Sequence, residues 1–483
     1  MSPEHHGFRA LRWSAIDVVA RHGIGFIVMI VLARLVAPED FGFVAMLQLF
    51  FGLAAVAIDG GMSAALIRQQ EHNARDEMSA FCFNLMAGAL IALALGVCSP
   101  FIAGLFQRPS LEPLIWAMAL GSFVNSFGLI HVALLTKALD FRRQTKVSIV
   151  ASTFSGALGV VLALNGYGAW SLVWQSVSSS LISTAMLWMI NPWRPAAGLS
   201  LDSMKRLFAF GKFVTLSAML DVVYNRTYTL LIGRSFSSAE LGFFWRAVTT
   251  RQMISDGFEA ITSRVTFPVL SSYGGERSQL AGTTRKILVA MMVLNVPSMF
   301  GLAVLAEPFV LLIFGEHWLP SAQVLQVLCL AGALWPLHTA NLNALMALGH
   351  SDLCFRIEVL KKAIGLATLA FASFYGVLAI AWSQVLVGVF AFFVNSFYSR
   401  SLFGYGSLRQ LADVAPVFVA AGGMAAVVAL AQGAVDASLV LQFSVSILLG
   451  GISFGIFLRL VAKELFFQHV RLMVGMFAVR KHE

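Results

Sequence analysis

The sequence predicts an all-α integral membrane protein with about 14 transmembrane helices. Its composition points to the bilayer, because 58% of the 483 residues are hydrophobic and only 12% are charged, with a mean hydropathy of +0.81. A soluble domain carries about 25% charged residues. Apolar runs of about 20 residues, the length that a helix needs to cross the hydrocarbon core, recur along the whole chain.

Short loops with polar residues, glycine or proline separate these runs and set the limits of each expected helix. The runs of the first half are 12–36, 41–67, 79–106, 112–136, 145–165 and 169–190. Those of the second half are 207–233, 240–268, 287–314, 320–348, 356–375 and 377–399, and two more follow at 413–432 and 437–460. No loop between them is long enough to fold as a separate domain.

Motifs of the first half recur in the same order about 200 residues later. They are an arginine followed eight residues on by Gly-Phe, a Pro-Phe pair ahead of a second phenylalanine, and Tyr-Gly ahead of Trp-Ser. Their positions are Arg34 with Gly42-Phe43 and Arg234 with Gly242-Phe243; Pro100-Phe101 with Phe106 and Pro308-Phe309 with Phe314; and Tyr167-Gly168 with Trp170 and Tyr375-Gly376 with Trp382.

Three motifs that recur in the same order predict two homologous halves, an arrangement that is common in transporters. We expect two pseudosymmetric six-helix lobes, an N-terminal lobe over 1–200 and a C-terminal lobe over 201–405. Two additional helices and a cytoplasmic tail occupy 406–483. Because six is an even number, both lobes enter the membrane in the same direction.

The basic residues orient the chain. Of the 33 lysines and arginines, the expected outer loops hold only Arg34, Arg108 and Arg234, and most of the others lie in the alternate loops. Cytoplasmic loops carry the excess of positive charge, so both termini are expected in the cytoplasm. The basic residues are spread over short loops between apolar runs, which argues against nucleic acid as the partner despite a pI near 9.6.

Ionisable groups inside membrane spans are costly, and each is therefore a candidate for function. Arg21 lies in the first run, and Arg246 and Arg251 lie in the eighth. Asn225 lies in the seventh run, beside Arg226, which we interpret either as polar lining or as a residue that extends outward to the interface. We expect Arg21, Arg246, Arg251 and Asn225 to bind an anionic substrate, because a guanidinium matches phosphate oxygens in geometry.

Three aspartates in the spans are candidates for coupling transport to an ion: Asp17, Asp221 and Asp256. Asp17 and Arg21 are four residues apart and share one helix face, so a structural ion pair is the alternative interpretation. Asp221 occupies the seventh run, which the repeat makes equivalent to the first.

Catalytic signatures are missing from the sequence. It contains no H-E-x-x-H, no G-x-S-x-G and no Walker loop. His338 stands near Asn341 and Asn343, a polar patch that suits a cavity lining or a helix contact better than a metal site. We therefore expect no enzyme activity, no cofactor and no metal. A polysaccharide polymerase or glycosyltransferase would need a large outer loop or a catalytic domain, and neither is present.

The sequence resembles the Wzx-type polysaccharide repeat-unit flippases and exopolysaccharide exporters of the multidrug/oligosaccharidyl-lipid/polysaccharide superfamily. The likeness is densest in residues 10–270. The stretches that carry it are residues 32–42 (LARLVAPEDFG), 58–67 (IDGGMSAALI), 137–142 (KALDFR), 166–173 (GYGAWSLV), 210–212 (FGK) and 241–247 (LGFFWRA).

The resemblance implies export of an undecaprenyl-diphosphate-linked oligosaccharide across the bacterial inner membrane, with membrane lipids and possible polymerase and co-polymerase proteins as partners. Related lipid-diphosphate flippases place cavity arginines on spans one, two and eight. Arg21 and Arg246 match two of these positions. Span two has no central arginine, because Arg68 lies at its cytoplasmic end, so the third position has no counterpart. The alternative function is a multidrug/cation antiporter on the same scaffold.

Overall fold

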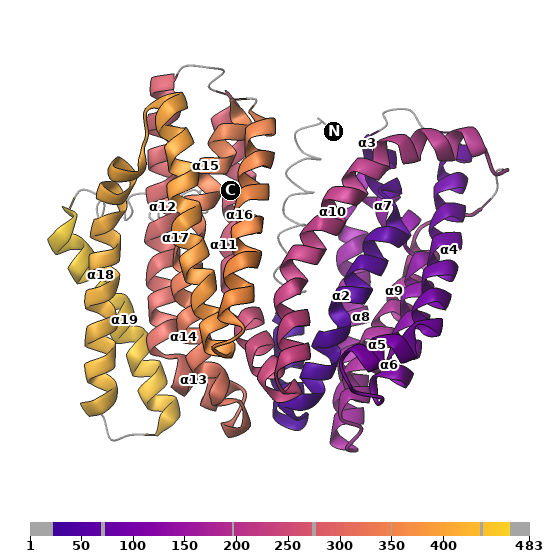
Figure 1. The fold of residues 1–483 in the computed structure, drawn as a ribbon, viewed down its shortest axis with the longest axis horizontal. Coiled ribbons are helices and arrows are strands. Elements are labelled where there is room, and N and C mark those ends of the chain that lie inside the picture. The colour runs from indigo at the N-terminus through magenta and orange to yellow at the C-terminus, as the bar shows by residue number, and fades with distance from the viewer. Residues whose placement is uncertain are drawn as a thin grey trace, which may run out of the picture. The chain divides into compact units, whose positions relative to one another are not determined.

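A computed structural model describes residues 23–68, 73–195, 198–272, 277–348, 350–434 and 438–463 (Figure 1). Within these ranges the regular structure is helical, and no strand occurs. The predicted all-α class is therefore confirmed. Asp17 and Arg21 lie outside the described residues.

The chain begins in the described part with the helix Gly23–Leu35. Residues up to 190 then form α2 (Pro38–Asp59), α3 (Met62–Arg68), α4 (Ala74–Val97), α5 (Ser99–Leu105), α6 (Leu111–Ser126), α7 (Leu129–Lys137), α8 (Phe141–Leu164) and α9 (Ala169–Ile190). Two helices of equal length follow, α10 (Leu201–Ser235) and α11 (Ser238–Ser272).

The rest of the chain forms α12 (Arg277–Val304), α13 (Ala306–Ile313), η1 (Glu316–Trp318), α14 (Pro320–Ala333), α15 (Trp335–Ala347), α16 (Ser351–Ala372), α17 (Val377–Phe403), α18 (Ser407–Ala434) and α19 (Leu439–Val461). Within the described residues, each apolar run expected from the sequence corresponds to one helix or to consecutive helices. In the described part, nine helices have the length and hydropathy to cross a membrane, or ten if the bent pair α6–α7 counts as one span. The count of about 14 stays a prediction.

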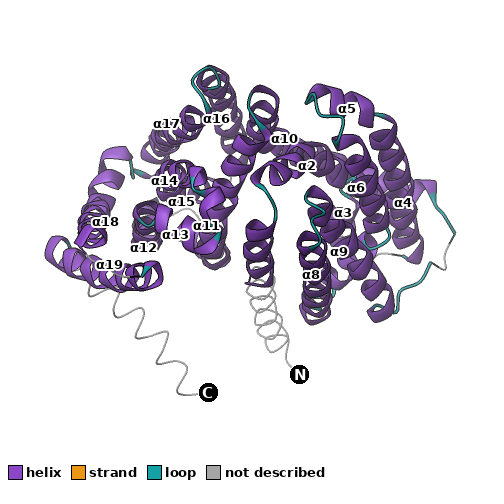
Figure 2. Cartoon of the chain, turned by 90° about the horizontal axis from the view of Figure 1, so that it is seen from below, coloured by secondary structure: helices purple, strands orange, loops and turns teal. Residues whose placement is uncertain are grey.

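The chain forms two compact units, residues 1–245 and 246–483. In the first unit α8 packs on α9, α9 on α6, and α6 on α4 (Figure 2). In the second unit α16 packs on α17, α17 on α14, and α14 on α12. The predicted lobe boundary near residue 200 precedes α10, whereas the compact units divide after Trp245, because α10 packs on α2, α3 and α4.

The order of elements repeats as well. A long helix followed by a short one, α4–α5, is echoed by α12–α13, and the broken helix α6–α7 is echoed by α14–α15. The third sequence echo marks equivalent turns, because Gly168 and Gly376 immediately precede α9 and α17 with φ of +49° and +101°. Residues with a Cβ rarely adopt this conformation, which explains glycine at both places. The helices α18 and α19 have no counterpart, and they pack on each other and on α12.

The Gly-Phe echoes contact each other reciprocally inside the first unit. A Cβ on Gly42 would lie 1.9 Å from the carbonyl oxygen of Ser238, and a Cβ on Gly242 would lie 2.1 Å from that of Pro38. The offset from Pro38 to Ser238 equals the offset from Gly42 to Gly242. The glycine of each motif thus contacts the residue that lies four positions before the glycine of the other motif. A two-fold axis imposes this reciprocity on an interface.

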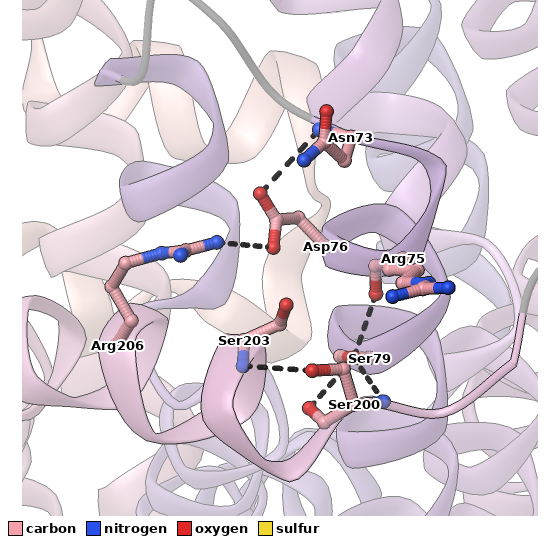
Figure 3. A network of polar contacts seen from close by, with 7 residues as sticks. All are labelled: Asn73, Arg75, Asp76, Ser79, Ser200, Ser203 and Arg206. Carbon is pink, nitrogen blue, oxygen red and sulfur yellow. Dashed lines mark hydrogen bonds and ion pairs between the residues drawn. The ribbon is translucent and has the colours of Figure 1, made fainter.

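A polar network joins the N-terminal ends of α4 and α10 (Figure 3). Asp76 is buried, its Oδ1 lies 2.6 Å from Nη2 of Arg206, and its Oδ2 accepts from the backbone N–H of Asn73. Ser79 Oγ accepts from the backbone N–H of Ser200 and donates to backbone carbonyls. In the second unit Arg285 of α12 pairs likewise with Asp413 of α18 at 2.6 Å. An arginine–aspartate pair therefore ties two helices together in each unit.

We predict that Gly42→Ala and Gly242→Ala each destabilise the protein, because the added methyl group overlaps a backbone carbonyl that has no side-chain freedom. Overpacking of this kind costs about 1–3 kcal/mol. Thermal unfolding in detergent is the measurement, and Gly104→Ala is the control, because a Cβ there meets nothing within 4 Å. Stability equal to that of the control in both variants would contradict the reciprocal contact.

Candidate functional site

A half-buried glutamine of α2 accepts hydrogen bonds from α10 and from the start of α11. Gln48 of α2 accepts at Oε1 from Nη1 of Arg226 at 2.5 Å and from the indole Nε1 of Trp245 at 3.4 Å. Phe41 stacks on Trp245, with ring centroids 6.0 Å apart. Arg226 therefore contacts α2, and both interpretations, polar lining or a side chain that extends outward to the interface, stay predictions.

Asp221 and Asn225 lie one turn apart on α10, and both side chains are exposed within the described structure. They belong to the first unit, as does Arg226. Sequence reasoning placed both residues inside a span, and the structure shows both side chains on the exposed part of α10. Their expected roles stay predictions.

Arg246 has a fully buried side chain in the second unit. Its guanidinium carbon lies 4.6 Å from the ring centroid of Trp318 and 5.0 Å from that of Phe314. A desolvated cation–π contact is worth about 2 kcal/mol or more. Trp318 in η1 and Phe314 at the end of α13 thus form an aromatic cage around this cation. In this conformation Arg246 does not line an open cavity.

Arg251 lies against α14. A Cβ on Gly332 would come within 3.2 Å of Arg251 Cδ, so the glycine provides the space through which the arginine stem passes. Asn295 of α12 donates from Nδ2 to the carbonyl oxygen of Gly332 at 3.0 Å. Arg251 and Arg246, five residues apart, contact α14 and the α13–η1 region respectively, as expected from their different directions on one helix.

The candidate residues are distributed over both units. Trp245 and Arg246 are consecutive, yet Trp245 is anchored in the first unit and Arg246 in the second. Asp256 lies in α11, and its side chain is outside what the structure describes. Within the described ranges, no group of three or more His, Cys, Asp or Glu side chains has the arrangement of a metal site.

The polar patch around His338 includes a helix–helix contact. Asn341 of α15 accepts at Oδ1 from Gln410 at 2.8 Å and from Ser399 at 2.6 Å. These partners lie in α18 and α17. Asn341 therefore joins three helices of the second unit, which favours the structural interpretation for this residue.

Sequence reasoning missed a set of polar residues in the first unit. Ser122 and Asn125 of α6 and Ser176 and Ser180 of α9 line a cavity of about 200 Å³ together with apolar residues of α2. A signal was present in the sequence, because residues 176–180 read Ser-Val-Ser-Ser-Ser inside an otherwise apolar run. That these serines line a cavity could not be predicted, because the sequence does not show that α6 packs beside α9.

The chain has the fold of a multi-pass membrane transporter. It is similar to the structure of lipid II flippase MurJ in the inward closed conformation, with a TM-score of 0.76 and 14% identity, over 94% of this chain and 99% of that one. It is also similar to an inward-facing MATE family multidrug resistance transporter of the MOP superfamily, with a TM-score of 0.61 and 15% identity, over 81% and 98% of the two chains.

The family model described as "Polysaccharide biosynthesis protein" matches residues 31–323, more than half of the chain, and the protein belongs to this family. Relatives include the lipopolysaccharide biosynthesis protein WzxC of Escherichia coli K12, 25% identical over 75% of this chain and 74% of the relative. The teichuronic acid biosynthesis protein TuaB of Bacillus subtilis is 27% identical over 73% of each. The succinoglycan biosynthesis transport protein ExoT of Rhizobium meliloti is 26% identical over 79% and 78%. The resemblance inferred from the sequence is thus confirmed.

We predict that Arg246→Met abolishes transport while the protein still folds. Methionine is unbranched and makes favourable contacts with aromatic rings, so it can fill the place of the arginine stem beside Phe314 and Trp318. Arg246→Lys should retain partial transport, because lysine keeps the charge but lacks the planar fork of donors. The measurement is exported polysaccharide per unit of membrane protein in cells that lack the native gene.

The matched control is Arg108→Met, because Arg108 is exposed in an expected outer loop. Export near the wild-type rate in Arg246→Met would remove this residue from the transport mechanism. A greatly reduced amount of protein in the membrane would instead assign Arg246 a role in stability alone.

Proposed function

We propose that this protein is a flippase that moves undecaprenyl-diphosphate-linked oligosaccharide repeat units across the bacterial inner membrane for exopolysaccharide, capsule or O-antigen synthesis. One observation carries the proposal: a chain of the polysaccharide biosynthesis protein family has, over 94% of its length, the fold of a lipid II flippase. Relatives in polysaccharide pathways, one of them named as a transport protein, support the same substrate class.

The chemistry of the substrate explains the charged residues inside the protein. A diphosphate with attached sugars cannot cross hydrocarbon unaided, because its charged and hydroxyl groups would lose their hydration. Guanidinium groups replace part of that hydration through charge-assisted hydrogen bonds to phosphate oxygens. Arg246 and Arg251, with Arg21 and Asn225, are the residues that we assign to this role. The lipid tail stays in the bilayer during transport.

Alternating access gives the aromatic cage a function. Arg246 is fully buried in the described conformation, and its guanidinium contacts the rings of Phe314 and Trp318. Under the proposal, a second conformation releases the guanidinium from the two rings and presents it to the diphosphate. The substrate then shifts the equilibrium by as much as it prefers the released state.

The topology proposed here has 14 spans, two lobes over 1–200 and 201–405, and both termini in the cytoplasm. The distribution of basic residues over the loops supports it. Reporter fusions at 137–146 and at 165–168 should report opposite sides of the membrane, and the same side for both would reject this topology. Polymerase and co-polymerase proteins are the proposed partners at the outer face.

The alternative is a multidrug/cation antiporter, since the MATE transporter shares the fold. A cationic drug requires an acidic or aromatic site, whereas the buried charge that the structure describes on α11 is cationic. Arg246 therefore favours the anionic substrate.

The deciding experiment measures flipping of fluorescent undecaprenyl-diphosphate-linked oligosaccharide in proteoliposomes of the purified protein. We expect flipping by the wild type and none by Arg246→Met. A cationic dye serves as the competing substrate. Transport of the dye together with no movement of the lipid would overturn the proposal in favour of the antiporter.

Asp221 is the proposed coupling residue, with Asp17 and Asp256 as further members of the coupling set. We predict that Asp221→Asn keeps the fold, because the two side chains have the same shape, but makes flipping independent of an imposed pH gradient. Asp202→Asn, an exposed position in the first turn of the same helix, is the control. Unchanged pH dependence in Asp221→Asn would reject proton coupling at this residue and leave the membrane potential as the driving force.

A further inference from the structure

The first unit contains a cavity of about 200 Å³ among α2, α6 and α9. These three helices pack on one another (Figure 2). Phe51 of α2 lies on its wall, 13 residues after the helix begins, which is about 20 Å along the axis. Because α2 has the length and hydropathy of a membrane span, we expect the cavity at the depth of the hydrocarbon core, which is about 30 Å thick.

Four uncharged polar residues face this cavity. Ser122 Oγ donates to the carbonyl oxygen of Met118 at 3.1 Å, and Ser180 Oγ donates to that of Ser176 at 3.3 Å. Each hydroxyl oxygen keeps two lone pairs that accept hydrogen bonds. Asn125 and Ser176 are exposed, and among the described residues their side chains make no hydrogen bond. The wall thus offers donors and acceptors that helix packing does not use.

Charge and size define the ligand. The lining contains no ionisable side chain, so the cavity offers nothing to neutralise a phosphate or a cationic drug. Drug-sized molecules occupy cavities of about 300–1,000 Å³, which is larger than this one. A single uncharged ring with several hydroxyl groups fits both limits, with its hydroxyls on the serines and Asn125 and an apolar face towards Phe51.

We propose that this cavity binds one uncharged monosaccharide of the lipid-linked glycan and thereby selects the sugar. The inference rests on the proposed function, and it assigns the sugar to α2, α6 and α9, separately from the arginines assigned to the diphosphate. A site built from hydrogen bonds discriminates between sugars, because a sugar that lacks a hydroxyl forms fewer of these bonds and binds more weakly.

The test compares the affinities of detergent-purified variants for two kinds of ligand. One is undecaprenyl diphosphate, and the other is the same lipid carrying one glucose, galactose or N-acetylglucosamine. The variants are Ser176→Ala, Ser180→Ala and Asn125→Ala. The matched control is Ser183→Ala on the same helix, whose hydroxyl donates to its own helix at Ser179 and does not line the cavity.

We expect at least one sugar to strengthen binding to the wild type. Each cavity variant should then bind that glycolipid about 3- to 10-fold more weakly, the effect of one lost hydrogen bond. Binding of undecaprenyl diphosphate should be unchanged, and Ser183→Ala should match the wild type. Thermal unfolding of each variant checks that the fold is intact.

Three outcomes would overturn the assignment of the cavity: no sugar adds affinity to the wild type, the variants bind the glycolipid as the wild type does, or they lose affinity for both lipids equally. Failure of the wild type to bind any undecaprenyl diphosphate lipid would instead overturn the proposed function. The two failures are therefore distinguishable.

Discussion

The hydrocarbon core supplies no water to backbone N–H and C=O groups, and the rest of the structure follows from this constraint. The described chain meets it with helices, which satisfy these groups internally. Where a helix is interrupted, the neighbouring backbone approaches closely: Gly60 follows the last residue of α2, and a Cβ on Gly211 of α10 would lie 2.6 Å from the Gly60 carbonyl oxygen. Glycine permits this contact, and the interruption is covered by another helix.

Polar side chains inside the units obey the same constraint. Arg226 donates to Gln48, Arg246 contacts the rings of Phe314 and Trp318, and Asn341 joins three helices. Each contact compensates for lost hydration in one conformation. A transporter that alternates between conformations must replace such contacts, and under the proposed function the substrate diphosphate is what replaces the rings around Arg246.

Sequence reasoning predicted the helical class and the limits of the apolar runs, because hydrophobicity over about 20 residues is a local property of the chain. It did not predict the breaks that divide several runs. The break after Ser126, where α6 and α7 meet at 41°, has no proline, and its Asn125, Ser126 and Gly128 are residue types that unbroken membrane helices also contain. Arg246 was identified as a buried cation, but its aromatic cage was not, because Phe314 and Trp318 lie about 70 residues further along the chain.

The sequence by itself determined that the chain spans a membrane, that its motifs repeat and that arginines occur at positions buried in spans. Composition, periodicity and charge decide these properties without knowledge of neighbours. Only the tertiary structure decided that Gly42 and Gly242 pack reciprocally on Ser238 and Pro38, and that serines of α9 meet Asn125 in one cavity. The physical reason is that close contacts and cavities arise between helices distant in sequence, where packing of whole surfaces, not any local signal, sets the distances.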